Sequence, residues 1–175
     1  MKVRRQYACA VAWILLLLSA TDAMAAELIV LKAHRTLEFK DGESSRVFRI
    51  SLGLAPFGPK SMQGDRKTPE GSYYITHKNA KSQFYLSLGI SYPNLDDARA
   101  GLRAGLISKS EFARIETANK HKKLPPQGTR LGGDIFIHGG GAQLDWTWGC
   151  IALNNQDMDF LFTHVAVGDK VTILK

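Results

Sequence analysis

Short apolar runs that fit β-strands occupy both ends of the chain, and one stretch with helical period separates them. The first two runs are Leu28–Leu31 and Leu37–Phe39. Val47–Leu52 alternates apolar and polar residues with the period of a strand, and Asp41-Gly42 in front of it is a hairpin turn signal. These features predict three antiparallel strands at the start of a mostly β domain.

Glycine and proline punctuate the segment that follows. The residues from Pro56 to Asp65 predict a loop, which leads through Thr68-Pro69-Glu70-Gly71 to a strand at Tyr73–Thr76. Nearer the other end, the apolar run Ile135–Ile137 predicts a buried strand. Lys170–Leu174 predicts the strand that closes the domain.

The stretch from Asn94 to Lys120 has helical period. Asn94 is a helix N-cap with two aspartates in the turn after it, and Ser108-Lys109-Ser110-Glu111 is a capping box for a second helix. These signals predict a helical hairpin at about residues 94–120, inserted in the β domain. It serves either as packing or as a wall of the functional site, and its return close to Ile135–Ile137 favours the wall. Asn154 is expected to cap one further helix.

Residues 1–25 have the three parts of a secretory signal peptide. Lys2, Arg4 and Arg5 form a basic start, Val11–Ser19 forms an apolar core, and Ala23-Met24-Ala25 supplies a cleavage site of small residues. An uncleaved membrane anchor is the alternative, but the apolar run is far shorter than the roughly 20 residues that span a bilayer. We therefore predict export to the periplasm or cell envelope, with residues 26–175 as one domain of ordinary size.

The formal net charge of the whole chain is +7. It falls to +5 when the signal peptide leaves, because three basic residues and one acidic residue leave with it. The remaining lysines and arginines are scattered, as on a solvated surface, and nucleic acid is a poor partner for an exported protein. Attraction to an anionic polymer of the envelope is compatible with this charge.

Cys150 is the one cysteine of residues 26–175, since Cys9 belongs to the signal peptide. In an oxidising compartment this thiol has no intramolecular partner. A lone cysteine is either a small buried hydrophobe or a nucleophile, and the residues around it decide between the two.

His138 is the candidate base for this thiol. A cysteine with an ordinary pKa of about 8.5 is mostly protonated at neutral pH, so a nucleophilic cysteine requires a base or a cation beside it. His138 ends the predicted strand and precedes Gly139-Gly140-Gly141, whose carbonyls can accept a hydrogen bond from the ring. Gly149 leaves space for a substrate carbonyl, and backbone N–H groups there can stabilise its oxyanion.

Two other classes of function are considered. A zinc peptidase would use His138 and Cys150 as ligands, but it requires a third ligand, and the chain has no HxxH, HxxxH or CxxC spacing. A noncatalytic module that binds the envelope would carry an inert cysteine. Thiol alkylation separates these classes, because a catalytic thiolate is expected to react fast in the folded protein.

Four residues that precede Cys150 have both a functional and a structural interpretation. Trp146 and Trp148 form an aromatic wall for a substrate, or they pack within the β domain. Asp145 orients His138, binds a substrate amine or makes a turn. Thr147 bonds the thiol region or supplies a structural hydroxyl.

The order of these motifs resembles the active-site signature of the L,D-transpeptidase (YkuD-type) family of bacterial cell-wall enzymes. The signature consists of Ile137-His138-Gly139 followed by Thr147-Trp148-Gly149-Cys150. The resemblance extends from about Glu27 to the C-terminus. Further blocks follow the family's order, namely Ser51-Leu52-Gly53, Gly58-Pro59-Lys60, Gly64-Asp65, Thr68-Pro69-Glu70-Gly71-Ser72-Tyr73 and Ser87-Leu88-Gly89.

The resemblance implies a single, mostly β catalytic domain, sandwich-like or barrel-like, that needs no metal or organic cofactor. In such an enzyme the thiolate, here Cys150, attacks the peptide bond after an L-centre of a peptidoglycan tetrapeptide stem. Terminal D-Ala leaves, a thioester remains, and an amine on a second stem or on a lipoprotein resolves it. By motif match, His138 is the base, the Gly139 carbonyl orients it, and Gly149 and Cys150 contribute oxyanion donors.

Two residues differ from the usual family pattern. The family often has histidine before the Gly-Cys pair and arginine two residues after the cysteine, where this chain has Trp148 and Ala152. Without an arginine that holds a substrate carboxylate, the reaction outcome stays open. An L,D-carboxypeptidase, or a hydrolase that cuts existing cross-links, is therefore an alternative to cross-linking.

Overall fold

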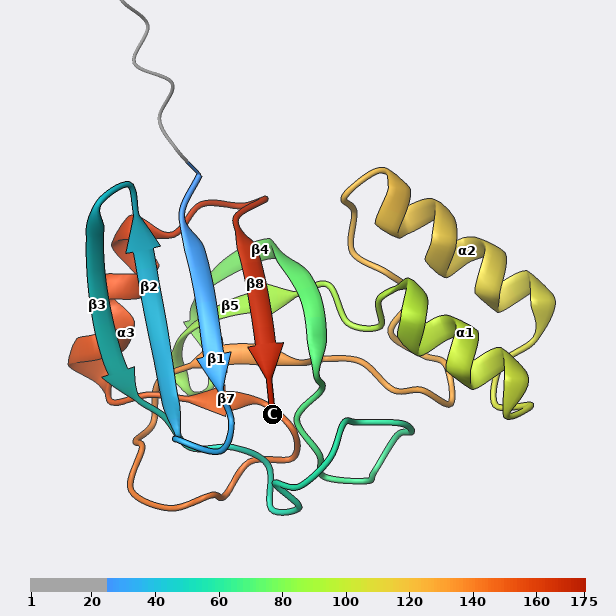
Figure 1. The fold of residues 1–175 in the computed structure, drawn as a ribbon, viewed down its shortest axis with the longest axis horizontal. Coiled ribbons are helices and arrows are strands. Elements are labelled where there is room, and N and C mark those ends of the chain that lie inside the picture. Colours follow the sequence, from blue (N-terminus) through green and yellow to red (C-terminus); the bar gives the residue numbers. More distant parts are fainter. Residues whose placement is uncertain (1–24) are drawn as a thin grey trace, which may run out of the picture.

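The computed structural model describes residues 25–175, so the predicted signal peptide lies, apart from Ala25, outside the described residues. The strands are β1 Glu27–Leu31, β2 Thr36–Asp41, β3 Ser44–Arg49, β4 Gly71–Ser82, β5 Tyr85–Ile90, β6 Phe136–His138, β7 Ile151–Ala152 and β8 Lys170–Leu174. They form one sheet in the order β3-β2-β1-β8-β4-β5-β6-β7, which curls so that its two halves cross (Figure 1). The expected mostly β architecture is confirmed.

The first three strands are antiparallel, as the sequence predicts, and β1 also pairs in parallel with β8. In β1 and β2 the buried positions alternate with more exposed ones, because successive side chains of a strand point to opposite faces. Strands from both halves of the curled sheet, together with helix α3 (Asn155–His164), enclose one core. Its fully buried members include Leu28, Val30, Leu37, Ile75, Leu88, Ile137, Ile151, Leu161 and Val171.

The short strands β6 and β7 carry the sequence motifs into the structure. Ile137 pairs in parallel with Ile151, and both side chains are buried in the core. The outer side of β7 is also occupied, because Ser51 and Ala152 exchange two backbone hydrogen bonds of 2.9 Å. β7 is therefore fixed on both sides although it contains two residues.

The helical insertion consists of α1 (Leu95–Arg103) and α2 (Lys109–Lys120) and lies at the end of the molecule away from α3 (Figure 1). Asn94 with Asp97, and Ser108 with Glu111, form the two capping boxes. The insertion has a small core of its own, made of Ala98, Ile107, Ile115 and Leu131. Within residues 25–175, no helix has the length and apolar character needed to cross a membrane.

Three details differ from the predicted elements. The strand expected at Val47–Leu52 is β3, which runs from Ser44 to Arg49 and has Phe48 as its one buried residue. The strand expected at Tyr73–Thr76 is the centre of the much longer β4, whose polar second half continues to Ser82 with two register shifts against β5. Asn154 stands at the N-cap of α3 as expected, but its side chain makes no capping bond. Its Oδ1 instead accepts a hydrogen bond from the N–H of Ala142 at 3.3 Å.

Candidate active site

The pairing of β6 with β7 brings His138 and Cys150 to one face of the sheet. Continued by one residue, the register that pairs Ile137 with Ile151 sets Cys150 opposite Phe136. Phe136 and His138 are two residues apart and share the face opposite Ile137. Cys150, opposite Phe136, shares it too, and all three line one cavity.

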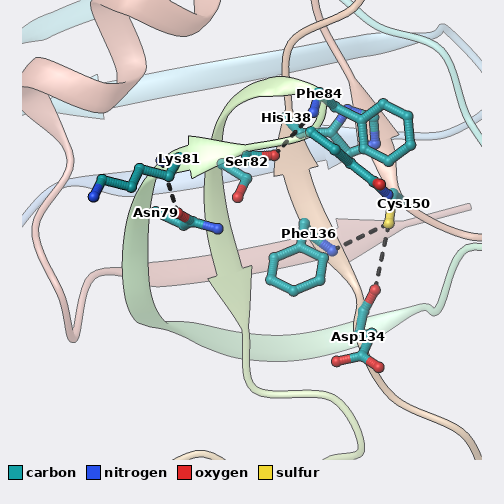
Figure 2. Close-up of a pocket in the computed structure, with 10 residues that line it drawn as sticks. Asn79, Lys81, Ser82, Phe84, Asp134, Phe136, His138 and Cys150 are labelled. Carbon is teal, nitrogen blue, oxygen red and sulfur yellow. Dashed lines mark hydrogen bonds between the residues drawn. The ribbon is translucent and has the colours of Figure 1, made fainter.

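The Cys150 sulfur is held by backbone groups. It accepts a hydrogen bond from the N–H of Phe136 at 3.4 Å, and its thiol donates to the carbonyl of Asp134 at 3.5 Å (Figure 2). Burial of the sulfur is the main reason that the pKa of the thiol rises to about 11. The resting thiol is therefore neutral at pH 7, and the fast alkylation expected for a catalytic thiolate does not follow from this geometry.

The His138 ring is buried, and Nδ1 lies 2.6 Å from the carbonyl oxygen of Gly139. A carbonyl only accepts, so the proton of the neutral ring is on Nδ1, and Nε2 has the free lone pair. Burial lowers the pKa of His138, an effect that the bond to Gly139 opposes. The ring is thus neutral at pH 7, in the form that can take a proton. The chain supplies the glycine carbonyl that the motif implied.

Two aromatic side chains hold this ring in place. Phe84 stacks on it with a centroid distance of 4.8 Å and an interplanar angle of 26°, and Trp146 meets it edge-on at 5.6 Å. The indole N–H of Trp146 also donates to the carbonyl of Gly141 at 3.2 Å. Trp146 therefore packs and lines the site at once. Phe84 was not singled out from the sequence, because it lies in the polar turn between β4 and β5, where no periodic pattern marks it.

Thr147 fixes the turn that leads to Cys150. Its buried hydroxyl donates to the carbonyl of Cys150 at 2.7 Å and accepts from the N–H of Gly149 at 3.2 Å. Gly149 has a φ of +124°, and a Cβ there would lie 2.7 Å from the carbonyl oxygen of Lys67. Among the described residues, nothing accepts a hydrogen bond from the N–H of Cys150. Of the two implied oxyanion donors, Cys150 is thus free and Gly149 is already engaged.

Two cavities meet at the thiol. One of about 430 Å³ and one of about 380 Å³ are both lined by Gln83, Phe84, His138 and Cys150. The first continues along the polar end of β4 to Asp134, and the second continues to Trp146, Thr147 and Trp148. A ligand on either side of the sulfur would therefore touch the turn between β4 and β5.

The helical insertion does not form a wall of this site. The residues that line the two cavities around Cys150 belong to β4, β5, the turn between them and the segments 134–138 and 146–150, and none belongs to residues 94–120. The expectation that the hairpin borders the groove is therefore wrong. Its contacts lie elsewhere, for example where the Tyr73 hydroxyl donates to the carboxylate of Asp97 at 3.0 Å.

Trp148 and Asp145 have different surroundings. Trp148 is 70% exposed at the edge of the second cavity, and the guanidinium of Arg66 lies over its ring at 4.9 Å. Asp145 forms an ion pair with Arg35 at 2.7 Å and accepts from the N–H of Leu52 at 2.8 Å. It lines a separate cavity of about 210 Å³ and not the two cavities at Cys150.

Residues 26–173 match the family described as YkuD, the L,D-transpeptidase catalytic domain. This chain belongs to that L,D-transpeptidase family. The Escherichia coli (strain K12) protein "Putative L,D-transpeptidase YafK" is 29% identical over 146 residues, which are 78% of this chain and 45% of that protein. The chain thus spans about half the length of this curated relative.

Solved structures of L,D-transpeptidase folds agree with the architecture. The helical cell shape determining protein Pgp2 of Campylobacter jejuni, as a K307A mutant, has a TM-score of 0.57 and 25% identity, over 88% of this chain and 48% of that one. Bd1075 of Bdellovibrio bacteriovorus has a TM-score of 0.53 and 20% identity, over 87% of this chain and 48% of that one. An L,D-transpeptidase of Mycobacterium smegmatis has a TM-score of 0.50 and 11% identity, over 86% of this chain and 58% of that one. The last two likenesses concern the fold alone.

Metal-binding side chains do not cluster in the described part of the chain. Between residues 25 and 175, no three His, Cys, Asp or Glu side chains gather in a way that can hold a metal ion.

Proposed function

We propose that this protein is an exported L,D-transpeptidase that acts on peptidoglycan stem peptides through a thioester on Cys150. The observation that carries the proposal is the position of Cys150 and His138 on one face of the paired strands, where two cavities meet. Membership of a family that acts on peptidoglycan stems supports the substrate class. The predicted signal peptide supports a place in the periplasm or cell envelope.

Acylation begins with the transfer of one proton. Bound substrate turns the thiol of Cys150 away from Asp134, and Nε2 of His138 takes its proton. The sulfur attacks the carbonyl of the L-centre, and a C–S bond forms. The oxyanion accepts from the free N–H of Cys150, and from the N–H of Gly149 once that group leaves the hydroxyl of Thr147. The C–N bond then breaks, and D-Ala leaves with the proton that His138 held.

The thioester is resolved by an amine. The nitrogen of a second stem, or of a lipoprotein, attacks the thioester carbonyl, and His138 takes the proton that the nitrogen loses. A new C–N bond forms, the C–S bond breaks, and the proton returns to the sulfur of Cys150. Water in place of the amine gives trimming by the same steps, so access of water decides between transfer and hydrolysis.

Side chains of the second cavity are proposed to bind the peptide. Trp148 and Trp146 offer aromatic surface there, and Arg66, stacked on Trp148, offers a cation to a substrate carboxylate. In this proposal, Arg66 takes the role of the arginine that the family often has two residues after the cysteine, where this chain has Ala152. Thr147 and Asp145 support the site through the backbone that they bind.

The test is incubation of the purified protein with disaccharide-tetrapeptide muropeptides, followed by mass spectrometry. A cross-linked dimer, with loss of D-Ala and a thioester adduct on the protein, is expected. Cys150→Ala should form neither product nor adduct and should keep the fold, since the change removes one sulfur atom. D-Ala release without dimer would assign trimming instead. Absence of both product and adduct in the unaltered protein would refute the proposed function.

A further inference from the structure

The peptide unit between Gly139 and Gly140 is held at both ends. Its carbonyl oxygen lies 2.6 Å from Nδ1 of His138, and its N–H donates to Oδ1 of Asn155 at 2.9 Å. A peptide unit is planar, so a bond that fixes the direction of the N–H also fixes the direction of the carbonyl. Asn155 thus acts on the group that the His138 ring bonds.

This glycine loop has no side chains with which to support itself. A Cβ at Gly139 would lie 2.6 Å from Oδ1 of Asn155 and 3.0 Å from Cβ of Tyr85, so the space is already filled. Gly140 has a φ of +106°, which side chains rarely adopt. Support for the loop must therefore come from another element.

Helix α3 provides that support. Asn155 is its first residue, and the buried side chains of Met158 and Leu161 anchor the helix in the core. The preceding Asn154 reaches the same loop further along, where its Oδ1 accepts from the N–H of Ala142 at 3.3 Å. Both asparagines fasten the loop, but Asn155 alone of the two binds the peptide unit that contacts the ring.

We propose that Asn155 is a positioning residue for His138. By holding the peptide between Gly139 and Gly140, it keeps the carbonyl aimed at Nδ1. The ring proton then stays on Nδ1, and the lone pair of Nε2 stays available to the thiol. The effect on the reaction rests on the proposed function, whereas the effect on the position of the ring proton does not.

The experiment compares Asn155→Ala and Asn155→Asp with the control Asn154→Ala in the full protein. The ¹⁵N shifts of the His138 ring report which nitrogen carries the proton. Intact-mass spectrometry follows acylation of Cys150 by a carbapenem, whose strained lactam is an acyl donor, across a range of pH. Thermal unfolding establishes that each variant is folded.

Asn155→Ala is expected to give a mixture of the two ring tautomers and acylation that is about 3- to 10-fold slower, the range for loss of one neutral hydrogen bond. Asn155→Asp keeps the acceptor and so keeps the proton on Nδ1. Its added negative charge stabilises the protonated ring, so the acidic limb of the pH profile should move to higher pH. Asn154→Ala should match the unaltered protein within about 2-fold.

An Asn155→Ala protein with an unchanged tautomer and rate would overturn the proposal. Equal changes in Asn155→Ala and Asn154→Ala would also overturn it, since they would mean general support of the loop. If Asn155→Ala does not fold, Asn155→Asp decides. A folded Asn155→Asp protein in which Nδ1 of His138 carries no proton would contradict the proposal. If even the unaltered protein is not acylated, the proposed function fails, and the ring shifts still decide the role of Asn155.

Discussion

The thiol of Cys150 points at the carbonyl oxygen of Asp134, 3.5 Å from the sulfur, and not at the ring of His138. The same burial that raises the pKa of the thiol to about 11 lowers the pKa of His138. The resting site therefore pairs a neutral thiol with a neutral imidazole. In the proposed mechanism, proton transfer therefore has to accompany substrate binding, in contrast to sites that hold a preformed thiolate.

The first prediction concerns alkylation of Cys150. The thiolate is the reactive form, and with a pKa of about 11 its fraction rises roughly tenfold for each pH unit between pH 7 and 10. Iodoacetamide labelling of the folded protein, followed by mass spectrometry, should be slow at pH 7 and should rise throughout this interval. The urea-unfolded protein is the control and should level off near pH 9. A plateau below pH 8.5 in the folded protein would mean that the resting thiolate is stabilised.

The second prediction concerns His138. Because burial lowers the pKa of His138, the ring stays neutral down to a pH below 6.5. The rate of acylation should therefore begin to fall only when the pH drops below 6.5. His138→Ala should slow carbapenem acylation by roughly 10²–10⁴, the usual contribution of general acid–base catalysis. His34→Ala and His164→Ala are the controls and should acylate normally. Equal losses in all three variants would indicate a folding effect.

The third prediction concerns Phe84, which stacks on His138 at 4.8 Å. Phe84→Ala admits water to the ring, so the pKa of His138 should rise toward its ordinary value and the acidic limb should move to higher pH. Water should also reach the thioester and raise D-Ala release relative to cross-linked dimer. Phe112→Ala in the helical insertion is the matched control. Similar product ratios for both variants would argue against a role for the turn between β4 and β5.

The fourth prediction concerns Arg66, which lies over Trp148 at the edge of the second cavity. Arg66→Ala should raise KM about 10-fold for a stem peptide with free carboxylates, as expected for loss of one charge-assisted hydrogen bond. A fully amidated peptide should show little change. Arg46 lies over the Phe160 ring at 4.5 Å and supplies the control Arg46→Ala. Equal effects of Arg66→Ala on both peptides would exclude carboxylate recognition.

The fifth prediction concerns stability. Burial raises the pKa of Asp97 to about 6, so between pH 4 and 6 the folded state binds its proton more tightly than the unfolded state. Stability should therefore fall as pH rises through this window, by on the order of 2–3 kcal/mol from this group. Asp97→Asn keeps an acceptor for Tyr73 and Asn94 and should remove this slope in urea unfolding. Asp96, the exposed neighbour of Asp97, supplies the control. The Asp96→Asn protein should keep the pH dependence of the unfolding free energy.

Elements with strong local signals were predictable from the sequence. The closing strand Lys170–Leu174, the N-cap at Asn94 and the capping box at Ser108 appear where the pattern put them. Cys150 and His138 were predictable as a pair, because the strand that ends at His138 and the turn before Cys150 carry distinctive residues. Their meeting on one face depends on β6 and β7 being neighbours, which no local pattern states.

The remaining parts of the site depend on contacts between segments far apart in the chain. The polar half of β4 extends because it pairs with β5, although its residues show no alternation. The helical insertion packs around Ile115 against Leu131, a contact between segments that no local pattern indicates. The role of Asn155 could not be predicted for the same reason, since its hydrogen bond to Gly140 joins a helix to a loop.

The two hydrogen bonds between Ser51 and Ala152 have a consequence for how a peptide can be recognised. Many proteins bind an extended peptide by adding it as a new strand at a free sheet edge, where main-chain bonds supply the affinity. Here the outer edge of β7, the last strand of the sheet, is already hydrogen-bonded to Ser51. A stem peptide next to Cys150 therefore cannot extend the sheet at Ala152 of β7, so side chains and the free backbone N–H of Cys150 gain importance for its recognition.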